Sequence, residues 1–114
     1  MECITWFVPI LPGKLEAWRA FVEEINGTRK DDFAKSRQRL GASREVIGLV
    51  QSPEGDFAAL FHEGESVSGG FSKLADSDDP FDVWFKDKIL ELHGVTKEML
   101  AQGPPSQVVL DYRA

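Results

Sequence analysis

The sequence predicts an α+β fold in which helices cover one face of a four-stranded antiparallel sheet. Short segments rich in β-branched and aromatic residues alternate with longer segments of helical periodicity, in the order strand, helix, strand, strand, helix, strand. The two middle strands are separated only by a short turn, which predicts an antiparallel hairpin flanked by two helical crossovers. This order is that of the split β-α-β, or ferredoxin-like, βαββαβ layout. A chain of 114 residues can build one core but not two, so we predict a single domain over residues 1–114.

The first strand is predicted over residues 3–11, where β-branched and aromatic residues run up to the breaker Pro12-Gly13. An apolar stripe of helical spacing follows it. The members of this stripe are Leu15, Trp18, Phe21, Val22 and Ile25. Gly27 interrupts the helical pattern and Gly41 ends it, so this segment is either one kinked helix or two helices in series.

The hairpin is predicted from two short apolar segments on either side of a turn. Residues 45–51 form its first strand and residues 57–63 its second. Residues 52–56 between them are rich in Pro, Gly and acidic residues, which is typical of a tight connection. After a loop rich in Gly and Ser, residues 71–75 could add one or two helical turns.

The second main helix is predicted to begin at Pro80, because proline suits the first turn of a helix. Ser77 or Asp79 can act as its N-cap, and the neighbouring aspartates suit the positive end of the helix dipole. Its apolar residues fall on one side of the helix: Phe81, Trp84, Phe85, Ile89 and Leu92. A short capped turn at residues 96–100 and a last strand at residues 107–113 complete the predicted fold.

Both faces of the predicted sheet are apolar. Large apolar residues point to both faces of the first strand, for example Trp6 and Phe7. The same holds for the second strand at Val46 and Ile47. The helices can cover only one face, and no further segment is left to cover the other. We therefore predict a homodimer that packs the two uncovered sheet faces together across a two-fold axis.

The composition excludes several classes of function. A formal net charge of −6 with only short, diluted basic runs argues against nucleic-acid binding. The single cysteine, Cys3, can form neither an internal disulfide nor a cysteine-based zinc site. No apolar run reaches the ~20 residues that span a bilayer, and the first residues lack the features of a signal peptide, so we expect a cytoplasmic protein without a membrane partner. We expect no cofactor and no metal, because no metal-binding cluster, phosphate loop or nucleophile motif occurs.

Candidate site residues belong to the predicted cleft between sheet and helices. His62 ends an otherwise apolar strand, and it would act as a general acid or base near neutral pH if it points into that cleft. Its alternative place is a half-exposed strand end, bonded to a backbone group. Trp6, Phe81 and Trp84 are the residues that we expect to line the cleft, although core packing also explains each of them. The expected ligand is a small apolar or aromatic molecule.

Two further polar residues have structural explanations. His93 ends the second main helix, where an imidazolium would complement the negative end of the helix dipole. Arg37 occupies an apolar phase of the first helical segment, so it either reaches the sheet edge or a bound anion, or extends along the surface to solvent. A metal site would need both histidines of the chain close together, with a carboxylate such as Glu63 or Glu91. Two isolated histidines are a weak signal for such a site.

Three local stretches resemble those of a known group of proteins: LPGK at residues 11–14, EGDF at 54–57 and SDDPFD at 77–82. Together with the layout from Ile4 to Tyr112, they resemble the dimeric α/β-barrel superfamily, and within it a family of small bacterial proteins of unknown function. The superfamily includes antibiotic-biosynthesis and haem-degrading monooxygenases, muconolactone isomerase-like enzymes and stress-responsive proteins. The resemblance implies a ferredoxin-like fold and a barrel closed by two subunits.

The catalytic pattern of the haem-degrading members is not met. Those proteins are similar to one another in using an Asn on the first strand, a Trp on the third strand and a His on the second helix. Here the first strand has no Asn and the third has no Trp, and His93 lies only at the end of the helix. We therefore expect a small-molecule binder, with two alternatives: a cofactor-independent monooxygenase or isomerase with His62 as base, or a non-catalytic dimer with a stress-related or structural role. Whether the chain is an enzyme stays open at this level.

Overall fold

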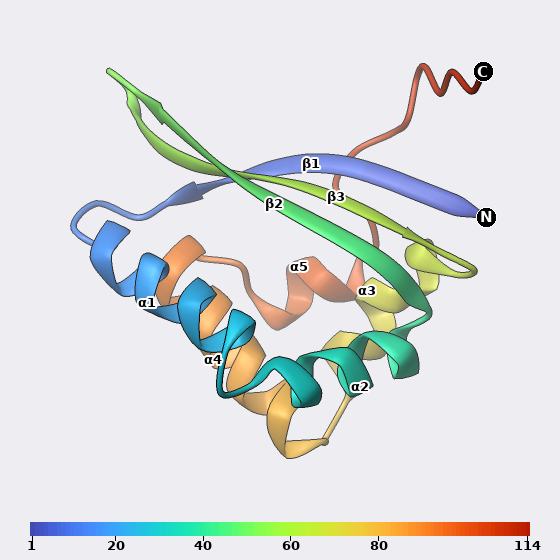
Figure 1. Cartoon of the computed structure of the whole chain (residues 1–114), viewed down its shortest axis with the longest axis horizontal. Coiled ribbons are helices and arrows are strands. Elements are labelled where there is room, and N and C mark those ends of the chain that lie inside the picture. Colours follow the sequence, from blue (N-terminus) through green and yellow to red (C-terminus); the bar gives the residue numbers. More distant parts are fainter.

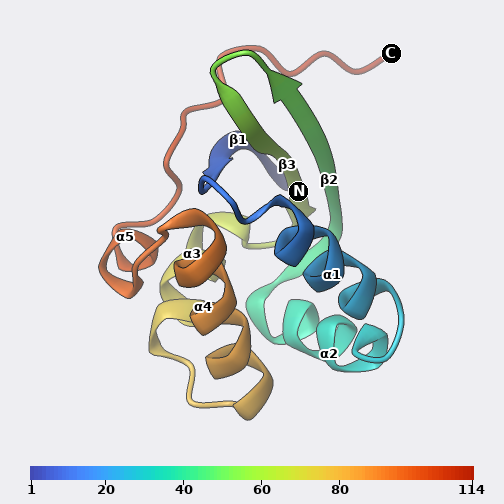
Figure 2. The same cartoon turned by 90° about the vertical axis from the view of Figure 1, so that its left-hand side faces the viewer.

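A computed structural model describes the whole chain, residues 1–114. Three strands and five helices follow one another along it. In chain order they are β1 (Glu2–Ile10), α1 (Leu15–Asn26), α2 (Lys30–Leu40), β2 (Ala42–Ser52), β3 (Gly55–Gly64), α3 (Val67–Asp76), α4 (Pro80–His93) and α5 (Lys97–Ala101). The strands form one antiparallel sheet in the order β1-β3-β2, and all five helices lie on the same side of it (Figure 1). Figure 2 shows the same two layers from the side, with the sheet above and the helices below.

The prediction of a four-stranded ferredoxin-like sheet is wrong. Residues 107–113 form no strand, and no residue after Gly103 makes a backbone hydrogen bond. The tail passes the free edge of β1, where the Ser106 hydroxyl donates to the Thr5 carbonyl and the Cys3 thiol donates to a carboxylate oxygen of Asp111 at 3.6 Å. These are side-chain contacts and not a ladder.

The apolar residues of the expected strand do not pack against the rest of the chain. Val109 and Leu110 remain 88% and 84% exposed. Strand propensity expresses packing on a half-buried surface, so it is not realised in a segment whose apolar side chains stay exposed. Pro104 and Pro105, which lack the backbone N–H of a ladder, also separate the tail from α5.

Several local predictions in the rest of the chain are confirmed. The hairpin pairs Ser52 with Gly55 at its turn, and of the two alternatives for the first helical segment the structure has two helices in series. Gly41 ends α2 with a φ of 83°, a left-handed conformation that favours glycine. Asp79 is the N-cap of α4 and accepts a hydrogen bond from the Phe81 backbone N–H at 2.9 Å.

Helix α3 is longer than predicted, and a close approach explains one of its glycines. A Cβ on Gly70 would lie 2.7 Å from the Leu40 carbonyl oxygen at the end of α2. The absence of a side chain at Gly70 therefore lets α3 pack directly against the end of α2.

The sheet has two unlike faces because side chains alternate along each strand. The inner face lies on the helices and is centred on the row Trp6, Leu60 and Ile47. The outer face carries the neighbouring row Phe7, Ala59 and Gly48, and no helix covers it. Below the inner face lies one hydrophobic core of 17 buried residues, drawn from the strands, the helices and the short connection before α5.

Candidate functional site

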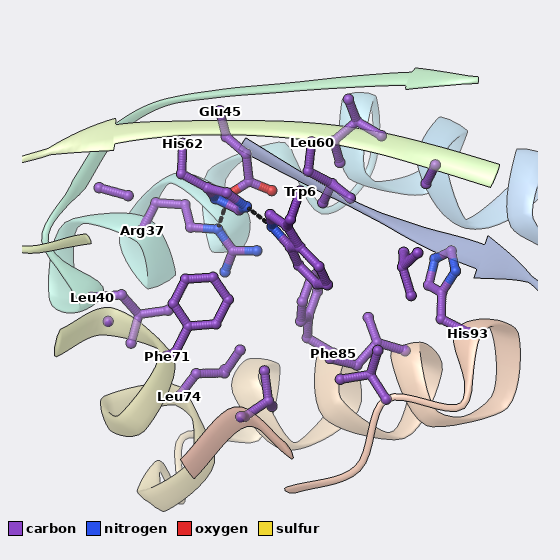
Figure 3. Close-up of a pocket in the computed structure, with 18 of the residues that line it drawn as sticks. Trp6, Arg37, Leu40, Glu45, Leu60, His62, Phe71, Leu74, Phe85 and His93 are labelled. Atoms are coloured by element: carbon purple, nitrogen blue, oxygen red, sulfur yellow. Dashed lines mark hydrogen bonds and ion pairs between the residues drawn. The ribbon is translucent and has the colours of Figure 1, made fainter. Parts of the chain in front are cut away.

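A cavity of about 90 Å³ lies between the inner face of the sheet and the helices (Figure 3). Most of its lining is hydrophobic, 17 of 22 residues. The polar residues of the lining are Arg37, Glu45, His62 and His93. A mostly apolar hollow with a few polar groups is the usual composition of a small-molecule site.

Three of the lining side chains form a hydrogen-bonded chain at one end of the cavity. The Trp6 indole Nε1–H donates to His62 Nε2 at 2.9 Å. Because an indole can only donate, His62 Nε2 must be the unprotonated nitrogen, and the proton lies on Nδ1. His62 Nδ1 lies 3.3 Å from Glu45 Oε1, so the imidazole donates to this carboxylate. The chain therefore sets the tautomer and the orientation of the ring.

The same carboxylate oxygen of Glu45 also binds a guanidinium. Arg37 Nε donates to Glu45 Oε1 at 2.8 Å, and the guanidinium lies 4.2 Å from the ring centre of Phe33 and 4.5 Å from that of Phe85. The side chains of Arg37 and Glu45 are only 11% and 6% exposed. The expectation that Arg37 extends to solvent is therefore wrong, because it is held inside by an ion pair and two aromatic rings.

Strand register explains why these residues meet. Glu45 on β2 lies directly opposite His62 on β3, and Ile4, the partner of His62 on β1, is two residues from Trp6. Arg37 projects from the last turn of α2, just before the Gly41 cap returns the chain to β2. All four side chains point toward the same space in Figure 3.

The electrostatics of the site keep Glu45 ionised. Burial alone would raise the pKa of this carboxyl, but the Arg37 charge and the hydrogen bond from His62 outweigh burial and lower it to about 2. The Arg37–Glu45 pair is then electrically neutral as a unit, and the His62 imidazole donates to the same carboxylate.

Arg37 also keeps unused hydrogen-bond donors at the cavity. Its Nη1 donates to the Ser36 hydroxyl at 3.2 Å, and Nη2 donates to no protein atom. No fully buried side-chain nitrogen or oxygen lacks a partner, so Nη2 keeps some accessible surface. Arg37 lines the cavity, and its guanidinium points toward this space in Figure 3. The site thus presents a guanidinium N–H to whatever occupies the hollow.

The structure brings together only part of the predicted site. Trp6 and His62 line the cavity, whereas Phe81 and Trp84 do not. Phe81 is buried in the core beside Phe33. Trp84 is half-buried against Phe21 of α1 and Phe81, and the Arg29 guanidinium covers its ring at 3.9 Å.

His93 has a different role from the expected cationic helix cap. Its Nδ1 donates to the Pro9 carbonyl at 2.8 Å, and burial lowers the pKa of its imidazole, which is therefore neutral at pH 7. This bond joins the end of α4 to the end of β1, and His93 lines the far end of the cavity. No group of three or more His, Cys, Asp or Glu side chains is arranged to hold a metal ion.

Glu45 was missed as a site residue, although the sequence contains a signal for it. Glu45 shares the alternation of Ile47 and Leu49, so it belongs to the buried face of an amphipathic strand. A carboxylate on that face needs a buried partner. The identity of that partner depends on how α2 packs, which is not a local property.

Comparison with protein-family models, with curated proteins and with solved structures finds no match to this chain. The resemblance to the barrel superfamily therefore stays an expectation. No helix is both long enough and apolar enough to cross a membrane.

We expect the stability of the protein to fall as the pH is lowered from about 5 to about 2. The folded-state pKa of Glu45, about 2, lies below its ordinary value of 4.5, so its stabilising contribution is complete above pH 5 and is lost as the carboxyl protonates in the folded state. The loss amounts to about 3 kcal/mol of unfolding free energy. Urea unfolding at pH 7 and pH 3 measures about 2 kcal/mol of this loss, because the folded-state carboxyl is still mostly ionised at pH 3. In Glu45→Gln the same pH change should have a clearly smaller effect, and equal pH dependence in the two proteins would contradict the assignment.

Proposed function

We propose that this protein binds a small, neutral, mostly apolar molecule with one carbonyl-type oxygen in the cavity beneath the sheet. The observation that carries this proposal is the accessible Arg37 Nη2 donor at an otherwise apolar hollow. A buried guanidinium with unused N–H groups is costly unless an acceptor meets it. A ligand oxygen at this position would satisfy the donor, while the rest of the ligand replaces empty apolar space.

The cavity volume limits the size of the ligand. Drug-sized molecules occupy sites of roughly 300–1,000 Å³, and an engineered cavity of about 150 Å³ holds benzene. At about 90 Å³ this cavity suits a molecule smaller than benzene. We therefore expect a ligand of roughly four or five non-hydrogen atoms.

The charge balance favours a neutral ligand over an anion. Glu45 already compensates the charge of Arg37, so a carboxylate in the cavity would remain a buried charge without a partner. A ketone, aldehyde or ester oxygen accepts the same N–H bond without this penalty.

The hydrogen bonds of His62 favour binding over catalysis. Both ring nitrogens are occupied, Nε2 by the Trp6 indole and Nδ1 by Glu45. To act as a general base, His62 would have to exchange its bond with Trp6 for one with the substrate. Monooxygenase or isomerase chemistry with His62 as base is therefore the second candidate, and it needs movement of Trp6.

The proposal is tested by adding acetone or 2-butanone, with propanoate as the anionic counterpart, and observing the Trp6 indole N–H by NMR. We expect a saturable shift of this signal with the neutral ketones and at least tenfold weaker binding of propanoate. Leu60→Phe, which fills the lining, should abolish the ketone effect. Val83→Phe, at a position 42% exposed on α4, is the matched control and should not. Absence of saturable shifts with both ketones, or equal shifts in Leu60→Phe, would overturn the proposal.

A further inference from the structure

The outer face of the sheet is an apolar surface that this chain leaves bare. Phe7 is 70% exposed there, and Val46 and Val50 are 46% and 47% exposed. No charged residue interrupts the surface between its two ends. Its members are Thr5, Phe7 and Pro9 on β1, Phe57, Ala59 and Phe61 on β3, and Val46, Gly48 and Val50 on β2. Contiguous apolar surface of this kind usually marks an interface.

Gly48 lies in the middle of this face, and the fold of the single chain does not explain it. Its backbone does not have a positive φ, and a Cβ built on it meets nothing within 4 Å. A glycine inside a strand weakens the strand, and where it persists it often marks the close approach of another group. Within this chain nothing approaches Gly48.

We propose that the outer face binds a second copy of this chain, with Phe7 of one copy seated over Gly48 and Ala59 of the other. Phe7, Ala59 and Gly48 form one row across the sheet, large on β1 and small on β3 and β2. A two-fold axis along β3, in the plane between two facing sheets, places β1 of each copy over β2 of the other. The large residue of each row then meets the small residues of its partner, so the surface is complementary to itself, as a two-fold interface requires.

The spacing of facing sheets is compatible with this packing, and the area of the face can be compared with that of known interfaces. Facing sheets lie about 10 Å apart, a gap that interdigitating side chains fill, with a large residue opposite a small one. Three strands of about ten residues cover roughly 30 Å by 14 Å. Such a face alone is smaller than the ~800 Å² that each partner contributes to a standard interface.

The C-terminal tail supplies further apolar area on the same side. It leaves the helical layer beyond α5 and rises past β1 to the outer side of the sheet (Figure 1). Its end lies near the outer residues Cys3 and Glu63, the latter 3.7 Å from Arg113 Nη2. Val109, Leu110 and Tyr112 project from it and are 75–88% exposed. In the proposed dimer these side chains pack on the second copy.

The decisive experiment is sedimentation equilibrium of the full chain and of variants at the Phe7–Gly48 contact. We expect the wild type to be a dimer at 10–100 µM and Gly48→Phe to raise the dimer dissociation constant at least 100-fold. The control Gly69→Phe, at an exposed position of α3 where a Cβ also meets nothing, should change it less than threefold. Circular dichroism of both variants confirms that the fold persists.

An exchange variant tests the geometry itself. In Phe7→Ala combined with Gly48→Phe, the large residue moves from β1 to β2, so the two-fold packing is restored with the roles reversed. We expect the dimer dissociation constant of this double variant to be at least tenfold lower than that of Gly48→Phe alone. The proposal is overturned if the wild-type protein is monomeric at 100 µM, whether or not its own tail folds onto the sheet. A Gly48→Phe variant that dimerises as tightly as the wild type also overturns it.

Discussion

Replacing Glu45 with glutamine should lower the unfolding free energy by about 3–5 kcal/mol. The substitution keeps the shape of the side chain and removes its charge, so the Arg37 guanidinium, 11% exposed, loses its counter-ion inside the protein. The hydrogen bond from His62 Nδ1 also loses its charged acceptor. Urea unfolding at pH 7, followed by tryptophan fluorescence and circular dichroism, measures the change.

A double variant distinguishes the cost of an unpaired charge from the value of the pair. Glu45→Leu with Arg37→Met removes both charges and leaves apolar side chains of similar size under the sheet. Since a buried ion pair contributes little beyond well-packed apolar residues, the double variant should be within about 1–2 kcal/mol of the wild type. A loss below 1 kcal/mol in Glu45→Gln alone would show that Arg37 finds solvent, and the description of the site would be wrong.

Replacing Asp82 with alanine should cost a similar amount, about 3–5 kcal/mol. This aspartate is fully buried and accepts hydrogen bonds from the Ser36 hydroxyl at 2.5 Å and the Ser77 hydroxyl at 2.6 Å. Arg39 Nη2 lies 3.2 Å from the carboxylate. Burial would raise the pKa of Asp82, but the hydrogen bonds from Ser36, Ser77 and Arg39 hold it below its usual value, so the carboxylate is ionised at neutral pH.

Asp82 joins three parts of the chain, which is why its loss is expected to be large. It lies in the first turn of α4 and binds α2 and the turn before α4 at once. Asp31→Ala is the matched control, because Asp31 lies in the first turn of α2 but is exposed. We expect less than about 1 kcal/mol for the control. Equal effects of the two substitutions in thermal and urea unfolding would refute this role of Asp82.

The sequence predicted the role of Asp82 only in general terms. The aspartates before the helix were expected to act at its N-terminus, and Asp79 does so as the N-cap. Asp82 was not distinguishable from its neighbours by local rules, since all of them suit the positive end of the dipole. Its burial depends on the serine that α2 presents to it, Ser36, which lies 46 residues away.

The residues of the candidate site were also predicted only in part. Trp6 and His62 were each expected to line the cleft, and both line the cavity, where they are joined by a hydrogen bond of 2.9 Å. Phe81 and Trp84 were expected beside them because helical spacing puts them on one side of α4 with the other apolar residues. Phe85 and Ile89 on that side do line the cavity, whereas Phe81 packs against Phe33 of α2 and Trp84 against Phe21 of α1. Spacing identifies which residues share a face, but it does not identify what the face packs against.

The sequence by itself indicated the hairpin, an interruption of the first helical segment at Gly27, the cap at Gly41, a cap at Ser77 or Asp79 before Pro80, and the apolar character of both sheet faces. These features depend on neighbours within a few residues, whose conformational preferences act before any tertiary contact forms. Only the tertiary structure decided that residues 107–113 are not a strand and that Arg37 and Glu45 form a buried pair. Both outcomes depend on what a segment packs against in three dimensions: the apolar residues of the tail pack on nothing, whereas Arg37 pairs with a carboxylate beneath the sheet.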